Sequence, residues 1–329
     1  MREGQIEAAP DGHVRARLLS PEHQVTLAGL AETWSAHTIS WRLRGYGRLV
    51  GDLSVLSRIR GAFGAALLAG ASDAAINGRP CTFNPPSAFE ALFRKQGRMT
   101  RGLDFPSPWV ISIDAKKSDL AISLTLFGFA IDWAPAAAET MTRALRTLVE
   151  WPRTSPPLPS TPEVIECRAT TIMGMEIAAG VTSLDIELLS PFVVTGADPR
   201  ERPEGILTGL GTRLSGLARW HDLGLDQLID WTEIKAAGRS LSYRFHDVSV
   251  AQWNRGSRRQ GLTIPMSGLT GRIEIVGDLT SGVMTLLTLG STCHMGADTV
   301  FGCGRYRIVD AIRTDGAPGR NAGLDTSAG

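Results

Sequence analysis

The sequence predicts an α+β protein made of two tandem βαββαβ units. In both halves of the chain, segments with the alternation typical of strands and segments with the apolar spacing of helices follow one another in a similar order. A proline-rich stretch, residues 151–162 (WPRTSPPLPSTP), separates the halves and favours an extended connector. At 329 residues, the chain is long enough for two domains that each bury a core.

The first half begins, after an N-terminal extension, with a strand-like segment over residues 39–50 (ISWRLRGYGRLV). Asp52 or Ser54 can cap a helix that continues to Leu68, because apolar residues recur there at helical spacing. An irregular stretch over 71–108 precedes strands at 109–113 and 120–129 and a helix over 136–149. Strand, helix, hairpin and helix are the beginning of a split βαβ pattern.

The second half repeats this order. Residues 183–194 predict a strand, and residues 206–220 predict a helix with leucines on one face. Strands over 240–251 and 270–276, a short helix over 278–289 and a closing strand over 306–312 follow. Two such copies predict two ferredoxin-like domains. The expected parts are an N-terminal extension (1–37), a first ferredoxin-like domain (38–150), a linker (151–162), a second ferredoxin-like domain with a glycine-rich loop (163–313) and a flexible tail (314–329).

Composition limits the kinds of protein that this chain can be. With 43% hydrophobic and 20% charged residues it is globular, not disordered. We find neither a leader-like start nor an apolar run of membrane-spanning length, so a cytoplasmic protein without a membrane partner is expected. The four cysteines, Cys81, Cys167, Cys293 and Cys303, form no CxxC pair. We therefore expect no disulfide framework, no zinc site and no cofactor.

Positive charge is concentrated locally, although the net charge of +1 gives no general argument for nucleic-acid binding. Residues 38–60 contain five arginines and one acid, Asp52, and residues 253–261 (WNRGSRRQG) contain three arginines and no acid. Thirty of the 34 basic residues are arginine, which suits guanidinium recognition of phosphate. A GC-rich coding bias is the alternative explanation for most of them.

Residues 289–309 (LGSTCHMGADTVFGCGRYRIV) carry the clearest functional signal. An apolar, helix-like run ends there in a glycine-punctuated loop that leads into a basic, strand-like segment. Gly302 and Gly304 allow positive φ and can bring backbone N–H groups close to a ligand, a geometry that suits phosphate. Arg305 adds fixed positive charge beside them. The sequence therefore predicts a phosphate-binding loop.

The same residues resemble the pattern LGxxxHxGxxTxFGxGRYxI of the CRISPR repeat-processing endoribonucleases of the RAMP superfamily. Residues 57–68 (SRIRGAFGAALL) resemble the first helix of that family, and residues 253–271 resemble its W-x-R-x-S-x-R-Q segment followed by GLxG. The resemblance covers residues 38 to 312. It implies tandem ferredoxin-like domains and an enzyme that binds CRISPR repeat RNA and cleaves the precursor transcript, without a metal, by attack of a ribose 2′-hydroxyl. It also implies that other CRISPR effector subunits are partners, with the guide RNA retained.

The general base is left open by this resemblance. Relatives place a histidine in or near the first helix, whereas the helix over 53–68 contains no histidine, tyrosine or lysine. His294, at the edge of the glycine-rich loop, is the preferred catalytic candidate, because an imidazole exchanges protons near neutral pH. Tyr46, Arg58 and Arg60 make an arginine-based site possible, in which guanidinium groups stabilise a pentacoordinate phosphorane. His37 and His246 are weaker alternatives.

RNA contacts are expected mainly from the second half. The candidates share a basic, stacking or loop-forming character: Trp253, Arg255, Arg258, Arg259, Gly302, Gly304 and Arg305. A non-catalytic CRISPR RNA-binding subunit is the principal alternative to an endoribonuclease. A small-molecule enzyme of the same fold is disfavoured, because the glycine-rich loop has no acid and base pair beside it.

Overall fold

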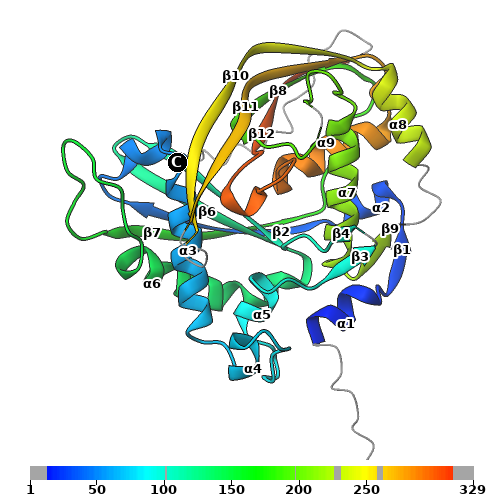
Figure 1. Cartoon of the computed structure of the whole chain (residues 1–329). Coiled ribbons are helices and arrows are strands. Elements are labelled where there is room, and N and C mark those ends of the chain that lie inside the picture. Colours follow the sequence, from blue (N-terminus) through cyan, green and yellow to red (C-terminus); the bar gives the residue numbers. More distant parts are fainter. Residues whose placement is uncertain (1–12, 101, 197, 226–230, 258–261, 314–329) are drawn as a thin grey trace, which may run out of the picture.

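The computed structural model describes residues 13–100, 102–196, 198–225, 231–257 and 262–313, and it contains two four-stranded antiparallel sheets (Figure 1). The first sheet has the order β5-β6-β2-β7. Its strands are β2 (Ser35–Leu43), β5 (Trp109–Lys116), β6 (Asp119–Phe127) and β7 (Val164–Met173). Helices α3 (Val55–Leu68) and α6 (Ala134–Thr147) pack together against one face of this sheet. Along the chain, these elements follow the order βαββαβ.

The second sheet has the equivalent order β10-β11-β8-β12. It consists of β8 (Val181–Phe192), β10 (Ser242–Ser257), β11 (Leu262–Val276) and β12 (Tyr306–Arg313), with helices α7 (Gly205–Arg219) and α9 (Ser281–Cys293). In both sheets the first strand in the chain lies between the third and the fourth, which is the ferredoxin-like arrangement. The predicted fold class is therefore confirmed.

The proline-rich segment has a different place from the one expected. Residues 151–162 connect α6 to β7, and β7 pairs with β2 from Ser35↔Met173 to Leu43↔Val164. β7 is thus the fourth strand of the first sheet, and the chain passes to the second sheet only after Met173. The linker over 151–162 and the domain start at 163 were wrong, because prolines mark irregular backbone without indicating which sheet the next strand joins.

The N-terminal extension packs against the second half of the chain. Its described part consists of α1 (His13–Leu19), β1 (His23–Val25) and α2 (Leu27–Thr33). β1 pairs in parallel with β9 (Leu223–Leu225), and Arg17 donates through Nε to Asp222 at 2.6 Å. The tail over 314–329 lies outside the described residues.

Several short elements were not predicted. The stretch over 71–108 contains α4 (Asp73–Ile76), α5 (Ala88–Leu92), β3 (Arg98–Thr100) and β4 (Leu103–Asp104), and α8 (Trp231–Ser240) precedes β10. Three 3₁₀ helices, η1 (Gly47–Gly51), η2 (Gly128–Trp133) and η3 (Thr299–Phe301), form connections. None of the helices within the described ranges has the length and apolar character needed to cross a bilayer.

Alternation of residue types gives the first sheet two distinct faces. On β6, Leu120, Ile122, Leu124 and Leu126 are fully buried, and each burial contributes about 1.5–3 kcal/mol. Two of the residues between them, Ser123 and Thr125, form hydroxyl pairs with β2: Ser40 Oγ lies 2.8 Å from Ser123 Oγ, and Thr38 Oγ1 lies 2.9 Å from Thr125 Oγ1. The sheet therefore has one apolar face under the helices and one polar face.

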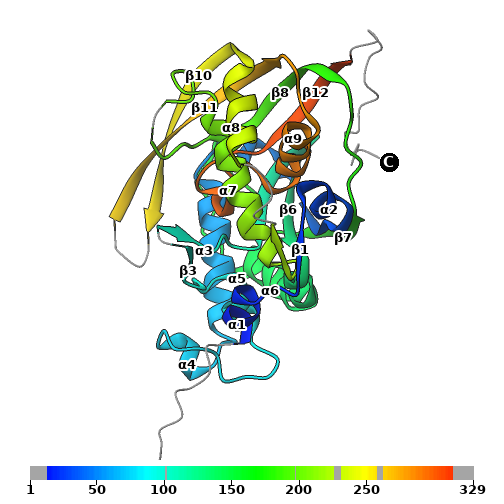
Figure 2. The ribbon, with the colours of Figure 1, turned by 90° about the vertical axis from the view of Figure 1, so that its right-hand side faces the viewer.

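β10 and β11 form a hairpin that extends beyond the second sheet. The hairpin is paired from Ser242↔Val276 to Ser257↔Leu262, whereas β8 pairs with β11 only from Leu269 towards Val276. The outer half of the hairpin, residues 250–257 and 262–268, projects from the body of the protein (Figure 2) and reaches α3. We call this part the hairpin arm. The strand expected over 240–251 therefore continues as far as Ser257, into the basic segment that begins at residue 253.

Candidate functional site

Two arginines from different halves of the protein, one on a helix and one on a strand, meet around one aromatic ring. Arg60 lies on α3 and Arg255 on the hairpin arm, and the Cζ atom of each lies 4.2 Å from the ring centroid of Phe301 in η3. Guanidinium groups at this distance are attracted by the negative face of an aromatic ring. We refer to Arg60, Phe301 and Arg255 as the arginine cluster.

The glycine-rich loop brings Phe301 to this position. Asp298 and Gly302, on either side of η3, have left-handed backbone with φ of 55° and 79°. A Cβ on Gly302 would lie 2.2 Å from Leu56 Cδ1 and 3.0 Å from the carbonyl oxygen of Ile111. Only glycine therefore lets the loop lie directly on α3 and β5.

The positive charge of the cluster is not neutralised by ion pairs. Neither Arg60 nor Arg255 forms an ion pair with a residue in the described ranges, and the Nε atom of each is buried without a hydrogen-bond acceptor. Burial, and then the charge of Arg255, lower the pKa of Arg60 to about 10, while Asp298 opposes this change. With this pKa, Arg60 remains protonated at neutral pH. The cluster is thus suited to bind an anion that accepts hydrogen bonds.

Arg305 is held in an ion pair between the two halves. Its Nη1 atom lies 2.8 Å from both carboxylate oxygens of Asp114, at the outer part of β5. Its backbone N–H donates to Ser190 Oγ at 2.9 Å. An RNA contact by Arg305 remains a prediction, but its guanidinium already has an anionic partner within the protein.

The glycines of the loop shape the backbone and do not present free amides. The N–H of Gly302 donates to the carbonyl of Thr299 at 3.0 Å, and that of Gly304 donates to Pro191 at 2.8 Å. Both glycines are buried, and a Cβ on Gly304 would lie 1.7 Å from the carbonyl oxygen of Met295. The expectation that these N–H groups face a ligand was therefore wrong, because the protein already uses them.

His294 lies inside the protein, although the sequence placed it at the edge of the loop. It is 4% exposed, and it ends α9 with φ of 64° and ψ of 162°. Burial, followed by the charges of Arg305 and Arg213, lowers its pKa well below the usual range, so the imidazole is neutral. Its role as the general base remains a prediction.

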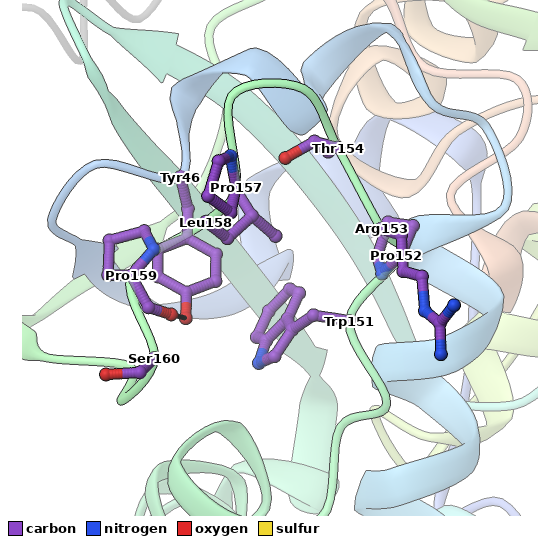
Figure 3. A pocket seen from close by; sticks show the side chains of 9 residues that line it. All are labelled: Tyr46, Trp151, Pro152, Arg153, Thr154, Pro157, Leu158, Pro159 and Ser160. Atoms are coloured by element: carbon purple, nitrogen blue, oxygen red, sulfur yellow. Dashed lines mark hydrogen bonds between the residues drawn. The ribbon is translucent and has the colours of Figure 1, made fainter.

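Tyr46 and Arg58 do not join the arginine cluster. Tyr46 is 1% exposed and donates its hydroxyl to the carbonyl of Pro159 at 2.9 Å. It lies edge-on to Trp151, and both side chains line a groove in the proline-rich segment (Figure 3). Arg58 is exposed and donates to the carbonyl of Glu150 at 2.9 Å. Positions two apart on a helix diverge by roughly 200°, which explains why Arg58 and Arg60 point to different places.

The remaining candidates have varied environments. Trp253 is half-buried on the hairpin arm opposite Met266, and an RNA contact there remains a prediction. Arg258 and Arg259 lie outside the described residues. His37 lies within β2, where Nδ1 is 2.8 Å from Thr171 Oγ1, and burial lowers its pKa. His246 is exposed, with Nε2 3.2 Å from a carboxylate oxygen of Glu274.

Phe301 and Asp298 were missed as site residues. Phe301 is part of the quoted TxFGxGRY pattern, so the sequence contained a signal for it, but its contacts depend on how the loop folds. Within the described ranges, no three side chains among histidine, cysteine, aspartate and glutamate lie close enough together to hold a metal ion.

Two family models match parts of this chain. The model of the CRISPR-associated endoribonuclease Cas6 family matches residues 186–306, which include Arg255 and Phe301. A second family model, described as an N-terminal domain, matches residues 56–150. None of the curated proteins matches this sequence.

Two solved structures have a similar fold. A product complex of Cas6 (TTHB231) has a TM-score of 0.53 and 13% sequence identity, over 83% of this chain and 99% of that one. The structure of Thermus thermophilus Cas6 (TTHB231) has a TM-score of 0.51 and 13% identity, over 84% and 99%. The suspected resemblance to the CRISPR-associated endoribonuclease Cas6 family is therefore confirmed by the family match over residues 186–306, and the two solved structures show that the fold is shared.

Proposed function

We propose that this protein binds the repeat of a precursor CRISPR transcript at the arginine cluster and cleaves it, without a metal, by attack of the ribose 2′-hydroxyl on the adjacent phosphate. The observation that carries this proposal is the pair of guanidinium groups around Phe301, each with a buried Nε–H that has no acceptor. A phosphate provides acceptors for such donors and an opposite charge. The similar Cas6 product complex supports RNA as the ligand.

The chemistry assigned to the cluster is stabilisation of negative charge. In-line attack by the 2′-oxygen places additional charge on the phosphoryl oxygens, and preorganised guanidinium groups in a partly dry site stabilise that charge. Arg60 lies on α3 in the first half and Arg255 on β10 in the second, so a phosphate between them would be held by both halves of the protein. Guanidinium groups do not serve as bases at neutral pH, and catalysis by charge stabilisation alone would be slow. Slow turnover suits a protein that stays bound to the guide RNA and has other CRISPR effector subunits as partners.

A second function, binding without cleavage, is favoured by one specific observation. His294, the histidine within the matched loop, is only 4% exposed, whereas a general base has to contact the substrate. A protein with an anion site and no accessible base would hold the processed RNA as a structural subunit.

Cleavage of a cognate repeat RNA in EDTA tests both possibilities. We expect cutting of the all-ribose RNA, a 2′,3′-cyclic phosphate or its hydrolysis product on the upstream fragment, and no cutting when the single ribose upstream of the scissile phosphate is deoxyribose. Arg60→Ala and Arg255→Ala should slow cutting and weaken binding. Arg58→Ala is the matched control, because that side chain lies on the same helix and points away from the cluster. A strict Mg²⁺ requirement would refute the mechanism. Tight RNA binding without cutting would favour the second function, a non-catalytic RNA-binding subunit.

A further inference from the structure

The groove in the proline-rich segment has aromatic and apolar walls (Figure 3). Its volume is about 390 Å³, at the lower end of the range of about 300–1,000 Å³ for sites that bind small molecules. Most of its lining comes from the connection between α6 and β7, and one residue comes from the turn before η1. The apolar and aromatic surfaces belong to Tyr46, Trp151, Pro157, Leu158 and Pro159.

Trp151 provides a ring and a free donor in this groove. The side chain is half-buried and lies edge-on to Tyr46, with 4.9 Å between the ring centroids. Tyr46 is fixed in turn, because its hydroxyl donates to the carbonyl of Pro159 at 2.9 Å. The indole Nε1–H of Trp151, by contrast, is buried and has no hydrogen-bond acceptor among the described residues. A ligand that brings an acceptor to this N–H removes the cost of leaving it without a partner.

The rim of the groove carries a surplus of positive charge. The described residues that line the groove include Arg153, which is exposed, and no acid. Arg48 and Arg58 each donate to a backbone carbonyl of the segment or of the residue before it, and these bonds do not neutralise their charge. Residues 48–58 and 150–160 together contain these three arginines and two acids, Asp52 and Glu150. The rim therefore suits an anionic chain that passes over it.

The groove and the arginine cluster lie at different sides of the same part of α3. Arg58 donates to the carbonyl of Glu150, next to Trp151, whereas Arg60 lies against Phe301. Positions two apart on a helix differ by roughly 3 Å along the axis and roughly 200° around it. An RNA strand that crosses the beginning of α3 can therefore contact both places.

A nucleobase fits this combination of features better than an apolar side chain does. Unpaired bases stack on aromatic side chains, every base carries hydrogen-bond acceptors, and the phosphates on either side of a base are attracted by arginines. An apolar side chain would leave the indole N–H without an acceptor. We propose that the groove binds one unpaired base of the repeat RNA, stacked on Trp151, with a neighbouring phosphate at Arg153. This inference rests on the proposed function and adds to it a subsite for a single nucleotide outside the arginine cluster.

A series of repeat RNAs that each contain one abasic nucleotide tests the proposal. Binding is measured by fluorescence anisotropy for the wild type and for Trp151→Leu. In the wild type, removal of the base at one unpaired position should weaken binding about tenfold, as expected for a stacked base. Trp151→Leu should bind the intact RNA about tenfold more weakly, and removal of that same base should then have no further effect, because both changes delete one interaction. Trp151→Phe, which keeps a ring without an N–H, should lose about threefold.

The controls concern charge and folding. Arg153→Gln should lower the salt slope of RNA binding by about 0.7, and Arg79→Gln, at an exposed position after α4, should leave the slope unchanged. The effect of each abasic site is a ratio of affinities within one variant, so a lower stability of Trp151→Leu does not alter it. If every abasic site costs Trp151→Leu as much affinity as it costs the wild type, the proposal is overturned, and a protein segment becomes the better candidate for the groove.

A short oligoadenylate separates this inference from the proposed function. It should quench the tryptophan fluorescence of the wild type more than that of Trp151→Leu, because a base stacks on the indole. Such quenching in a protein that does not bind repeat RNA would refute the proposed function and support the base site. Binding and cleavage of repeat RNA without any position that depends on Trp151 would support the proposed function and remove the base site.

Discussion

Replacement of Arg60 by methionine should stabilise the free protein while weakening its complex with RNA. These two opposite effects are expected of a residue that contributes to RNA binding but lowers the stability of the free protein. Methionine retains an unbranched side chain that can still lie against Phe301 and Phe93 and introduces no new hydrogen-bond donor.

The size of the effect follows from the environment of the guanidinium. A pKa lowered from 12.5 to about 10 corresponds to about 3 kcal/mol that disfavours the charged form in the folded state. At pH 7 the side chain is protonated in both the folded and the unfolded chain, so this whole cost is present, and it is relieved only as the pH rises above about 10. Loss of the cation–π contacts, at 4.2 Å to Phe301 and 5.1 Å to Phe93, offsets about 1–2 kcal/mol. A net stabilisation of about 1–2 kcal/mol is expected.

Urea denaturation at pH 7 measures the free energy of unfolding, and RNA binding over a series of salt concentrations measures the second effect. The variant should lose affinity and about one phosphate contact, which lowers the salt slope by about 0.7 for single-stranded RNA. Arg58→Met is the control for the helix itself, since Arg58 is exposed and should change stability by less than about 0.5 kcal/mol. Destabilisation by Arg60→Met together with unchanged RNA affinity would refute the assignment of Arg60 to an anion site.

Further predictions concern the loop, the histidines and the ion pair between the two halves. Gly304→Ala should destabilise the protein by more than about 3 kcal/mol in thermal or urea unfolding, because its Cβ would lie 1.7 Å from the carbonyl oxygen of Met295. The control Gly51→Ala should change stability little, because a Cβ there meets no atom within 4 Å. Equal effects of the two substitutions would contradict this account. Burial lowers the folded-state pKa of both His221 and His294, so the unfolded chain takes up protons first as the pH falls below about 6.5. Stability should then fall by up to about 1.4 kcal/mol per pH unit for each histidine, and His221→Gln should flatten the slope between pH 6.5 and 5 by about one proton. Asp114→Asn should lower the stability by less than about 1 kcal/mol, since its ion pair with Arg305 is partly exposed. The same substitution should strengthen RNA binding if the released guanidinium then contacts phosphate. Unchanged RNA affinity would assign Arg305 to the ion pair alone.

Local patterns predicted most of the fold, and pairing between distant segments explains what they missed. β5 and β6 were predicted because their apolar residues alternate and face helices, and α3, α6, α7 and α9 because their apolar spacing is helical. β7 was missed because it is an edge strand with exposed residues such as Cys167 and Met173, so no apolar face marks it. The extension of β10 to Ser257 was missed because the strand there is stabilised by β11 rather than by a core.

The candidate site was predicted in part. Arg60, Arg255 and the loop were each identified from local motifs, but Arg60 and Arg255 are 195 positions apart in the chain, and only the register of the hairpin brings them together. Arg58 was grouped with Arg60 on proximity in sequence, although the helix points it to the carbonyl of Glu150. The loop was recognised by its glycines, which allow the backbone to place Phe301. No local sequence pattern shows that an aromatic ring will lie between two guanidinium groups.

The parallel pairing of β1 with β9 has a consequence for synthesis of the chain. His23 pairs with Leu223, so the second member of this pair leaves the ribosome 200 residues after the first. At roughly 5–20 residues per second, the N-terminal elements wait about 10 to 40 seconds for their partner strand. The first sheet, whose last strand ends at Met173, is complete before then. The β1 segment, although made before the first sheet, therefore docks after that sheet is complete. Until then Leu27, Leu30 and Trp34, which are buried in the finished protein, lack part of the surface that covers them.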